Sequence, residues 1–132
     1  AYRWKCQFNE NSKNPAFSAS FPEMNHNEIM GWHFGQNHPL TERFAVLFLR
    51  DVNSAKHYQQ RITATQQILQ NNEIPFLEIY ADGQTELEKF FSIIYLGDFA
   101  TVYLAFLNQV NPTEINNIQF LKKQLQMEAA HE

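Results

Sequence analysis

Two short strand-like segments, separated by an amphipathic helix, decide most of the architecture open to this sequence. Residues 44–49 form a continuous apolar run, which is typical of a strand buried on both faces of a parallel sheet. Residues 55–69 carry apolar side chains at helical spacing, with Ser54 as the expected N-cap. Residues 74–80 form the second strand. This order predicts parallel strands joined by a right-handed helical crossover.

An N-terminal helix is expected over residues 1–13, because Trp4 and Phe8 stand at i, i+4 spacing and a proline-containing segment follows. Residues 14–43 then form a long irregular excursion, in which a short helix is expected at residues 27–32. A loop of this length in a compact domain is usually functional.

Two further helices are expected after the second strand. Thr85 and Glu88 form a capping box for a long helix whose apolar stripe continues to Phe106. The pair Gly97-Asp98 is expected to kink or divide that helix. The last helix is expected to open at Pro112-Thr113. Its inward-facing side chains are expected to be Ile115, Ile118, Leu121 and Leu125.

The predicted fold class is therefore α/β, with a three-layer arrangement of a parallel sheet flanked by helices. Two strands are too few for a stable open sheet. We expect the irregular region to supply another strand and the first strand to lie upstream of Ala1. The chain also begins with Ala1 rather than Met. Residues 1–132 are therefore expected to be one domain of a longer polypeptide.

Composition and charge indicate which kinds of molecule this chain could bind. The 132 residues are 44% hydrophobic and 18% charged, as in a globular domain. A net charge of −4 argues against a nucleic-acid partner, but it is compatible with a small anionic substrate. Cys6 is the sole cysteine, so no internal disulfide is possible and a reducing cytoplasm is the default location. No apolar run approaches the ~18–20 residues of a membrane span, so no membrane partner is expected.

Glu10 and His26 are the side chains best suited to chemistry. Glu10 lies between Asn9 and Asn11, and it is either a helix carboxylate paired with Lys13 or a general base. His26 is either a loop or helix-start residue, or an acid/base that works near neutral pH. A carboxylate and an imidazole together would suit proton transfer beside a carbonyl group.

Charged residues elsewhere in the sequence are weaker candidates for a functional role. Arg50 follows the first strand, where ligands of open α/β sheets gather, so it is a candidate substrate contact. Asp51 could be a phosphoacceptor in a receiver-like site, but the acidic pair and the lysine of such a site are not visible. Asp51 is therefore expected to order the following turn with Asn53. Lys122 and Lys123 lie on the last helix, where cations usually complement the helix dipole.

Neither a metal site nor a glycine-rich phosphate loop is expected. His26, His33 and His38 are seven and five residues apart, which matches no zinc-binding spacing, and Cys6 is remote from them. The four glycines are scattered. The phosphate of a phosphorylated substrate would therefore need to be bound by another part of the polypeptide.

Several ordered blocks of the sequence resemble one enzyme family. They are Arg3-Trp4-Lys5, Asn9-Glu10-Asn11, the segment from Phe21 to Ile29, Leu49-Arg50-Asp51, Gly97-Asp98, Tyr103-Leu104-Ala105, Asn111-Pro112-Thr113 and Leu121-Lys122. Together they closely resemble the C-terminal half of the bifunctional phosphoglucose/phosphomannose isomerases of the sugar isomerase (SIS) superfamily. The resemblance implies a SIS-type, flavodoxin-like fold. It also makes residues 1–132 the C-terminal SIS subdomain, beside an N-terminal subdomain that binds the phosphate.

The same resemblance implies an activity, namely interconversion of glucose 6-phosphate or mannose 6-phosphate with fructose 6-phosphate through a cis-enediol, without metal or cofactor. Glu10 would be the base, and His26 would assist ring opening from the neighbouring subunit of a homodimer. Lys122 would bond sugar oxygens, with Lys123 as the competing assignment, and Thr113 would lie near the sugar. The alternative is a non-catalytic SIS-like module for sugar-phosphate binding or dimerisation. The sequence does not reveal a preference between glucose and mannose.

Overall fold

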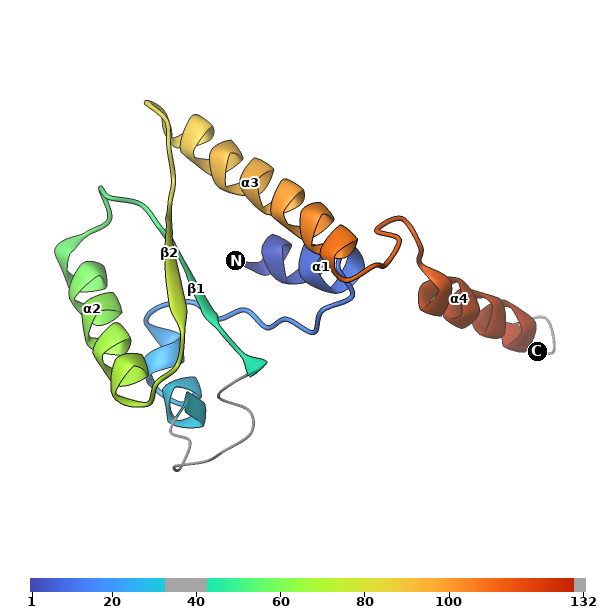
Figure 1. Cartoon of the computed structure of the whole chain (residues 1–132), viewed down its shortest axis with the longest axis horizontal. Helices are drawn as coiled ribbons and strands as arrows, with labels where there is room; N and C mark the ends of the chain where they lie inside the picture. The colour runs from blue at the N-terminus through green and yellow to red at the C-terminus, as the bar shows by residue number, and fades with distance from the viewer. Residues whose placement is uncertain (33–42, 130–132) are drawn as a thin grey trace. The chain divides into compact units, whose positions relative to one another are not determined.

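A computed structural model describes residues 1–32 and 43–129 of the chain (Figure 1). Strands β1 (Val46–Arg50) and β2 (Phe76–Tyr80) are parallel and joined by helix α2 (Lys56–Asn71). Each strand begins two residues later than predicted, but the strand–helix–strand order and the α/β class are confirmed. The three-layer arrangement and a strand upstream of this chain stay predictions. The remaining elements are α1 (Tyr2–Glu10), the 3₁₀ helices η1 (Glu23–Asn25) and η2 (Glu28–Trp32), α3 (Glu86–Leu107) and α4 (Asn116–Ala129).

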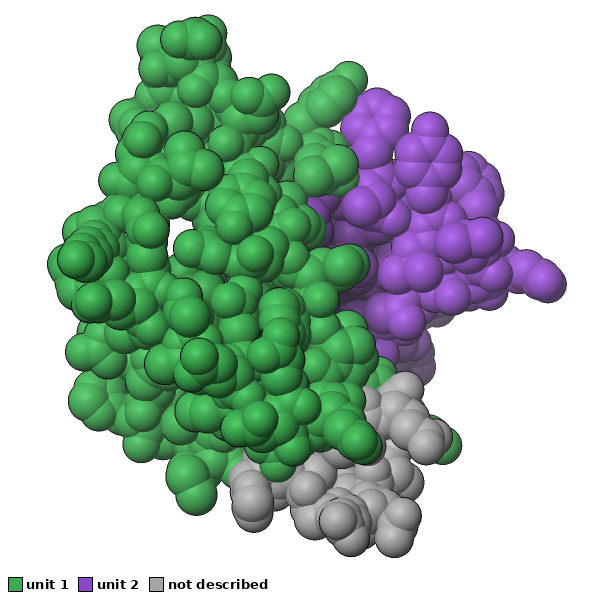
Figure 2. Space-filling view, turned by 60° about the vertical axis from the view of Figure 1, so that its left-hand side comes forward, with its two compact units in different colours: residues 1–2, 17–96 green, residues 3–16, 97–132 purple. Residues whose placement is uncertain are grey.

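The chain divides into two compact units, which Figure 2 colours separately. Unit 1 comprises residues 1–2 and 17–96, and it contains the sheet, α2, both 3₁₀ helices and the first half of α3. Unit 2 comprises residues 3–16 and 97–132, and it contains nearly all of α1, the second half of α3, and α4.

The core of unit 1 lies between α2 and one face of the sheet. Its buried members are Phe48, Ile62, Leu69 and Ile74. Ile62 and Leu69 belong to the apolar stripe predicted for this helix, so that part of the prediction is confirmed. The ring of Phe48 stacks on Phe21 with centroids 6.4 Å apart. The part of the excursion around Phe21 is thereby packed onto the core.

The two predicted N-caps have different outcomes. Thr85 and Glu88 form the expected capping box: the amide of Thr85 donates to the Glu88 carboxylate (2.8 Å), and the amide of Glu88 donates to the Thr85 hydroxyl (3.2 Å). The prediction of Ser54 as the cap of α2 is wrong. Ala55 has an extended backbone and takes the N-cap position, with no side-chain cap. The helix therefore starts one residue too late for the Ser54 hydroxyl to cap it.

Helix α1 ends at Glu10, three residues before the predicted end. The Ser12 hydroxyl donates to the carbonyl of Phe8 (2.8 Å), and the amide of Asn14 donates to the same carbonyl (3.0 Å). Lys13 has a left-handed backbone, with φ of 60°. A non-glycine residue in this conformation terminates a helix, which explains the earlier end.

In unit 2, α1 packs against the second half of α3. The buried ring of Trp4 fills the space beside Gly97, where a Cβ atom would collide with the indole. Asp98 accepts hydrogen bonds from Arg3 (2.7 Å) and Gln7 (2.6 Å) of α1. Gly97-Asp98 was expected to kink or divide α3. The division is wrong, because α3 is continuous and α1 packs against it at this pair, whereas a kink stays a prediction.

Most of the apolar side chains expected to face inward on α3 and α4 are exposed. Helix α4 starts at Asn116, beyond the predicted Pro112-Thr113, and contains no buried residue. Leu121 and Leu125 expose more than half of their surface, as do Leu87, Phe91 and Phe106 on α3. The predicted inward stripe of α4 is therefore wrong for the described chain, because none of the described elements buries it.

Helix α3 also corrects the expectation about membrane spans. It has 22 residues, and an 18-residue window within it has a mean hydropathy of 1.7. By length and composition alone it could cross a membrane, and it is the one described helix that meets this criterion. A single helix of this kind is a weak indication, because core helices of soluble proteins meet the same criterion.

Candidate functional site

Glu10 is the last residue of α1 and its side chain is exposed. The i+3 pairing expected from the sequence is only half right. The ammonium group of Lys13 donates to the backbone carbonyl of Glu10 (2.6 Å) rather than forming an ion pair with the carboxylate. Lys13 thus satisfies one of the carbonyls left open at a helix end. Glu10 is exposed to solvent at the end of the helix, and a general base must likewise be accessible to its substrate.

The position of α1, and hence of Glu10, is fixed by Asp98. The Arg3 guanidinium beside Asp98 holds the pKa of that carboxyl group below its usual value, and the Gln7 amide acts in the same direction. Asp98 is therefore ionised at neutral pH and serves as a charged acceptor for both donors of α1. Gln7 lies three residues before Glu10, so this anchor is less than one helical turn from the carboxylate.

Amide and hydroxyl groups hold the residues that follow Glu10. Asn11 donates to the fully buried hydroxyl of Thr101 (2.9 Å), which in turn donates to the carbonyl of Asp98 (3.0 Å). Asn108 donates to the carbonyl of Ser12 (3.0 Å) and to the side-chain oxygen of Asn14 (2.7 Å). These bonds join residues 11–14 to the end of α3. The sequence indicated a concentration of amides here, but not their partners about ninety residues away.

Thr113 lies in an exposed turn that is tied to the same end of α1. The side-chain oxygen of Asn111 accepts hydrogen bonds from the Thr113 amide (3.0 Å) and hydroxyl (2.9 Å), which is an Asx turn. Lys13, besides its bond to Glu10, donates to the carbonyl of Glu114 (2.6 Å). The structure therefore brings together the segments of Glu10 and Thr113, two of the predicted site residues.

Lys122 and Lys123 are both exposed on α4. Neither belongs to the hydrogen-bond network that joins Glu10, Lys13 and the Thr113 turn within the described chain. The role of Lys122 and the choice between the two lysines stay predictions.

His26 is in unit 1, whereas Glu10 is in unit 2, and a shared site for the two stays a prediction. The amide of His26 donates to the carbonyl of Glu23 (2.9 Å) and closes η1, while the residue is exposed. Its neighbours hold this segment in place: Met24 is buried, and Asn25 donates to the hydroxyl of Thr65 on α2 (3.0 Å). The imidazole is thus presented from a segment anchored on both the core and α2.

Arg50 at the end of β1 is engaged by β2. It forms an ion pair with Glu78, and its guanidinium carbon lies 5.3 Å from the ring centroid of Tyr80, directly opposite in register. The hydrogen bond from Arg50 lowers the pKa of Glu78. Only 12% of the Arg50 side chain is exposed, and its buried Nε has no partner among the described atoms. A substrate contact by Arg50 stays a prediction.

Asp51 orders the following turn as expected, because its carboxylate accepts the amide hydrogen of Asn53 (2.9 Å). The structure adds a lysine that the sequence did not reveal. Lys89 of α3 is buried and lies 3.2 Å from Asp51 and 2.9 Å from Glu86. The Asn53 amide and Lys89 lower the pKa of Asp51, and Glu86 and Asp51 raise the pKa of Lys89. These are the shifts of an ion pair that fastens α3 to the end of β1.

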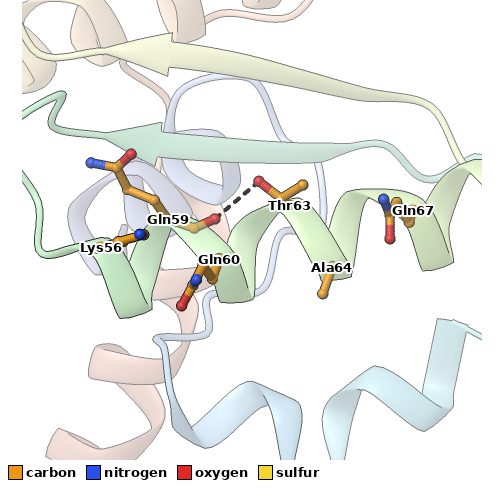
Figure 3. Close-up of a pocket in the computed structure, with 6 residues that line it drawn as sticks. All are labelled: Lys56, Gln59, Gln60, Thr63, Ala64 and Gln67. Atoms are coloured by element: carbon orange, nitrogen blue, oxygen red, sulfur yellow. Dashed lines mark hydrogen bonds between the residues drawn. The ribbon is translucent and has the colours of Figure 1, made fainter.

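Two further features offer no site. Among the described residues, no three His, Cys, Asp or Glu side chains cluster as metal ligands would, and His33 and His38 lie outside these residues. A shallow, open hollow lies along the surface of α2 (Figure 3), where the Thr63 hydroxyl donates to the carbonyl of Gln59 (3.0 Å). Its lining comes from one helix, without converging polar groups from a second element, so it lacks the character of a ligand pocket.

Comparison with known proteins agrees with the resemblance. Residues 1–125 match the family model described as the bacterial phospho-glucose isomerase C-terminal SIS domain. Three relatives are named bifunctional phosphoglucose/phosphomannose isomerase. The protein of Caldicellulosiruptor bescii is 38% identical over 125 residues, which is 95% of this chain and 36% of the relative. That of Aquifex aeolicus is 33% identical over 129 residues, covering 98% and 39%. That of Thermoplasma volcanium is 38% identical over 128 residues, covering 95% and 38%.

This chain thus spans little more than a third of the length of these relatives. The family match covers nearly all of its sequence, and the parallel βαβ unit agrees with an α/β domain of this kind. The chain belongs to the family of bacterial phospho-glucose isomerase C-terminal SIS domains.

Proposed function

We propose that this chain is the C-terminal SIS domain of a longer isomerase, which interconverts glucose 6-phosphate and mannose 6-phosphate with fructose 6-phosphate. The observation that supports this most directly is the placement of Glu10. An exposed carboxylate stands at the end of a helix that is anchored by Asp98 and held by Lys13. A firmly positioned carboxylate in a sugar-isomerase family domain is suited to general-base catalysis.

In the proposed reaction, Glu10 takes the proton from C2 of the open-chain aldose while the C2 electron pair forms the enediol double bond. The carbonyl oxygen at C1 gains a proton, and the hydroxyl at C2 loses one. Glu10 then returns its proton to C1, which gives the ketose. Because one carboxylate serves both carbons, rotation about C2–C3 would let either C2 epimer react. Lys122 and Thr113 would donate hydrogen bonds to sugar oxygens as charge develops on them.

His26 is proposed to open the sugar ring, by moving a proton between the anomeric hydroxyl and the ring oxygen. We propose that it acts on the substrate bound to the neighbouring subunit of a homodimer. The phosphate would be held by an N-terminal SIS domain, since the matched relatives are more than twice as long as this chain. The exposed apolar surfaces of α3 and α4 are consistent with such neighbours. The enzyme would act in the cytoplasm.

The experiment that tests this function is Glu10→Gln in the full-length polypeptide. The amide keeps the shape of the side chain but cannot accept the proton, so we expect kcat to fall by at least about 10²-fold. Binding of fructose 6-phosphate, measured calorimetrically, should be retained. Glu128→Gln on α4 is the matched control, and it should leave kcat unchanged. Normal turnover by the Gln variant would remove Glu10 from the mechanism, and an inactive wild-type protein that still binds sugar phosphate would favour the non-catalytic module.

A further inference from the structure

Lys13 joins two parts of the chain that are about a hundred residues apart in sequence. Its ammonium group donates to the carbonyl of Glu10 and to the carbonyl of Glu114, and both distances are 2.6 Å. The first carbonyl ends the helix that carries the proposed base. The second belongs to Glu114, whose amide closes the turn that carries Thr113 by donating to the carbonyl of Asn111. One charged group is thus bonded to the backbone of both segments.

The geometry of Lys13 suits this linking role. Its backbone is left-handed, with φ of 60°, three residues after α1 ends, and its side chain reaches back to the carbonyl of Glu10 at the helix end. Carbonyl oxygens at a helix C-terminus carry partial negative charge, so a cation there is favourable. The bonds from a charged donor to both acceptors are also stronger than bonds from a neutral donor.

The other described contacts hold each segment, but none of them bonds directly to both the end of α1 and the 111–114 turn. Asn111 orders the turn internally through the Thr113 amide and hydroxyl. Asp98 fixes α1 against α3. Lys13 alone among these residues bonds to both the α1 end and the 111–114 turn. Asn108 also ties Ser12 and Asn14 to the end of α3, three residues before this turn. Without Lys13 the turn would be tied to the α1 end only through that more distant contact, so its position relative to Glu10 would be less closely fixed.

We propose that Lys13 is a positioning residue, which sets the separation of the base Glu10 from the Thr113 turn without touching the substrate. The proposal rests on the proposed function, because it needs Glu10 to act on a sugar held beside Thr113. It separates Lys13 from Lys122, whose proposed contact is with the sugar itself. A displacement of about 1 Å between a catalytic group and its substrate can cost on the order of 10²-fold in rate.

The test compares Lys13→Met with Lys56→Met in the full-length polypeptide. Lys56 is an exposed lysine at the start of α2, outside the proposed site. We expect Lys13→Met to lower kcat about 10- to 100-fold while KM changes less than about threefold, because the substrate is bound mainly by other groups. Lys13→Arg keeps a charged donor and should recover part of the lost kcat. Lys56→Met should behave as wild type.

A second measurement tests, independently of activity, whether Lys13 holds the α1 end and the 111–114 turn together. In hydrogen–deuterium exchange, Lys13→Met should speed exchange in residues 10–14 and 111–115 together, with the remaining helices unchanged. Unchanged exchange in residues 111–115 would show that Lys13 does not hold this segment to the end of α1. Faster exchange with wild-type kcat would overturn the positioning role. If the wild-type protein does not isomerise sugar phosphates, the proposed function fails, and the exchange data still decide whether Lys13 joins the two segments.

Lys13→Gln keeps the test decisive if the Met variant does not fold. Glutamine is shorter and neutral, so it can bond to at most one of the two carbonyls with comparable geometry. The proposal requires Lys13→Gln to lose kcat as well, with its unfolding temperature close to that of wild type. A Gln variant with full kcat would show that a bridging cation is unnecessary.

Discussion

The ring of Trp4 occupies the volume that a side chain at Gly97 would need. A Cβ atom at Gly97 would collide with Cε2 and Nε1 of the indole, and neither the ring nor the helix backbone can move aside without losing contacts. The α1 helix can therefore approach α3 closely at this one position. This close approach brings Arg3 and Gln7 within hydrogen-bond distance of Asp98.

The first prediction concerns this contact. Gly97→Ala should lower the free energy of unfolding by about 1–3 kcal/mol, because the added methyl group overpacks a buried aromatic contact. Gly31→Ala is the matched control, since among the described residues no atom beyond its chain neighbours lies within 4 Å of a Cβ at Gly31, and the change should stay within about 0.5 kcal/mol. Urea denaturation measures both values. Equal stabilities of the two variants would show that α1 adjusts freely.

The second prediction concerns acid. The folded-state pKa of Asp98 is lowered by Arg3 and Gln7, so its stabilising contribution is present above the unfolded pKa of about 3.9 and is lost as pH falls through the lower folded value. The unfolding temperature of wild type should therefore exceed that of Asp98→Asn at neutral pH, and the difference should shrink below about pH 4. Asp82→Asn is the control, and its difference from wild type should not follow this profile. A pH-independent gap for Asp98→Asn would contradict the prediction.

The third prediction concerns sharing of His26 between subunits. Glu10→Gln and His26→Ala proteins should each be nearly inactive alone. When their subunits are mixed by unfolding and refolding, one of the two sites in each mixed dimer has both groups intact. About a quarter of wild-type activity should return if half of the dimers are mixed. Verified mixed dimers without activity would place His26 in the same site as the Glu10 of its own subunit, whereas a fully active His26→Ala protein would place His26 outside the mechanism.

The fourth prediction concerns residues 1–132 by themselves. This chain supplies the proposed base Glu10 and the proposed site residues His26 and Lys122, but the proposed phosphate site lies in another domain. Loss of the remote phosphate contacts should lower kcat as well as affinity, because they hold the reacting carbons in place. Purified residues 1–132 should therefore produce no glucose 6-phosphate or mannose 6-phosphate from fructose 6-phosphate. Turnover near that of the full-length polypeptide would place the phosphate site within this chain.

Features that depend on neighbours in sequence could be predicted. The capping box of Thr85 and Glu88 needs contacts only three residues apart, and the turn that Asp51 forms with Asn53 needs only two. The strand–helix–strand order followed from apolar periodicity alone. The local pattern also identified Glu10 as an unusual carboxylate among amides. These predictions required no knowledge of how distant segments meet.

Features that depend on distant partners could not be predicted. A lysine three residues after a glutamate suggests an ion pair, and only the return of the chain at Glu114 shows why Lys13 bonds to backbone carbonyls instead. The apolar stripe of α4 was visible, but a stripe does not state what covers it, and Leu121 and Leu125 are exposed here. The buried Lys89 was overlooked because its partner Asp51 lies 38 residues away.

Because Gln7 is fixed on Asp98, the number of residues between Gln7 and Glu10 determines the direction in which the Glu10 carboxylate points around the helix axis. Three residues separate Gln7 from Glu10, and each residue advances the helix by about 100°. Inserting one alanine between them would leave the Trp4–Gly97 contact and the hydrogen bonds to Asp98 intact. It would nevertheless rotate the Glu10 carboxylate by roughly 100° about the helix axis. A substitution at Glu10 changes the chemical group at the helix end, whereas an insertion before it changes the direction in which that group points. The number of residues between Gln7 and the proposed base Glu10 thus matters as much for the direction of the carboxylate as the identity of either residue.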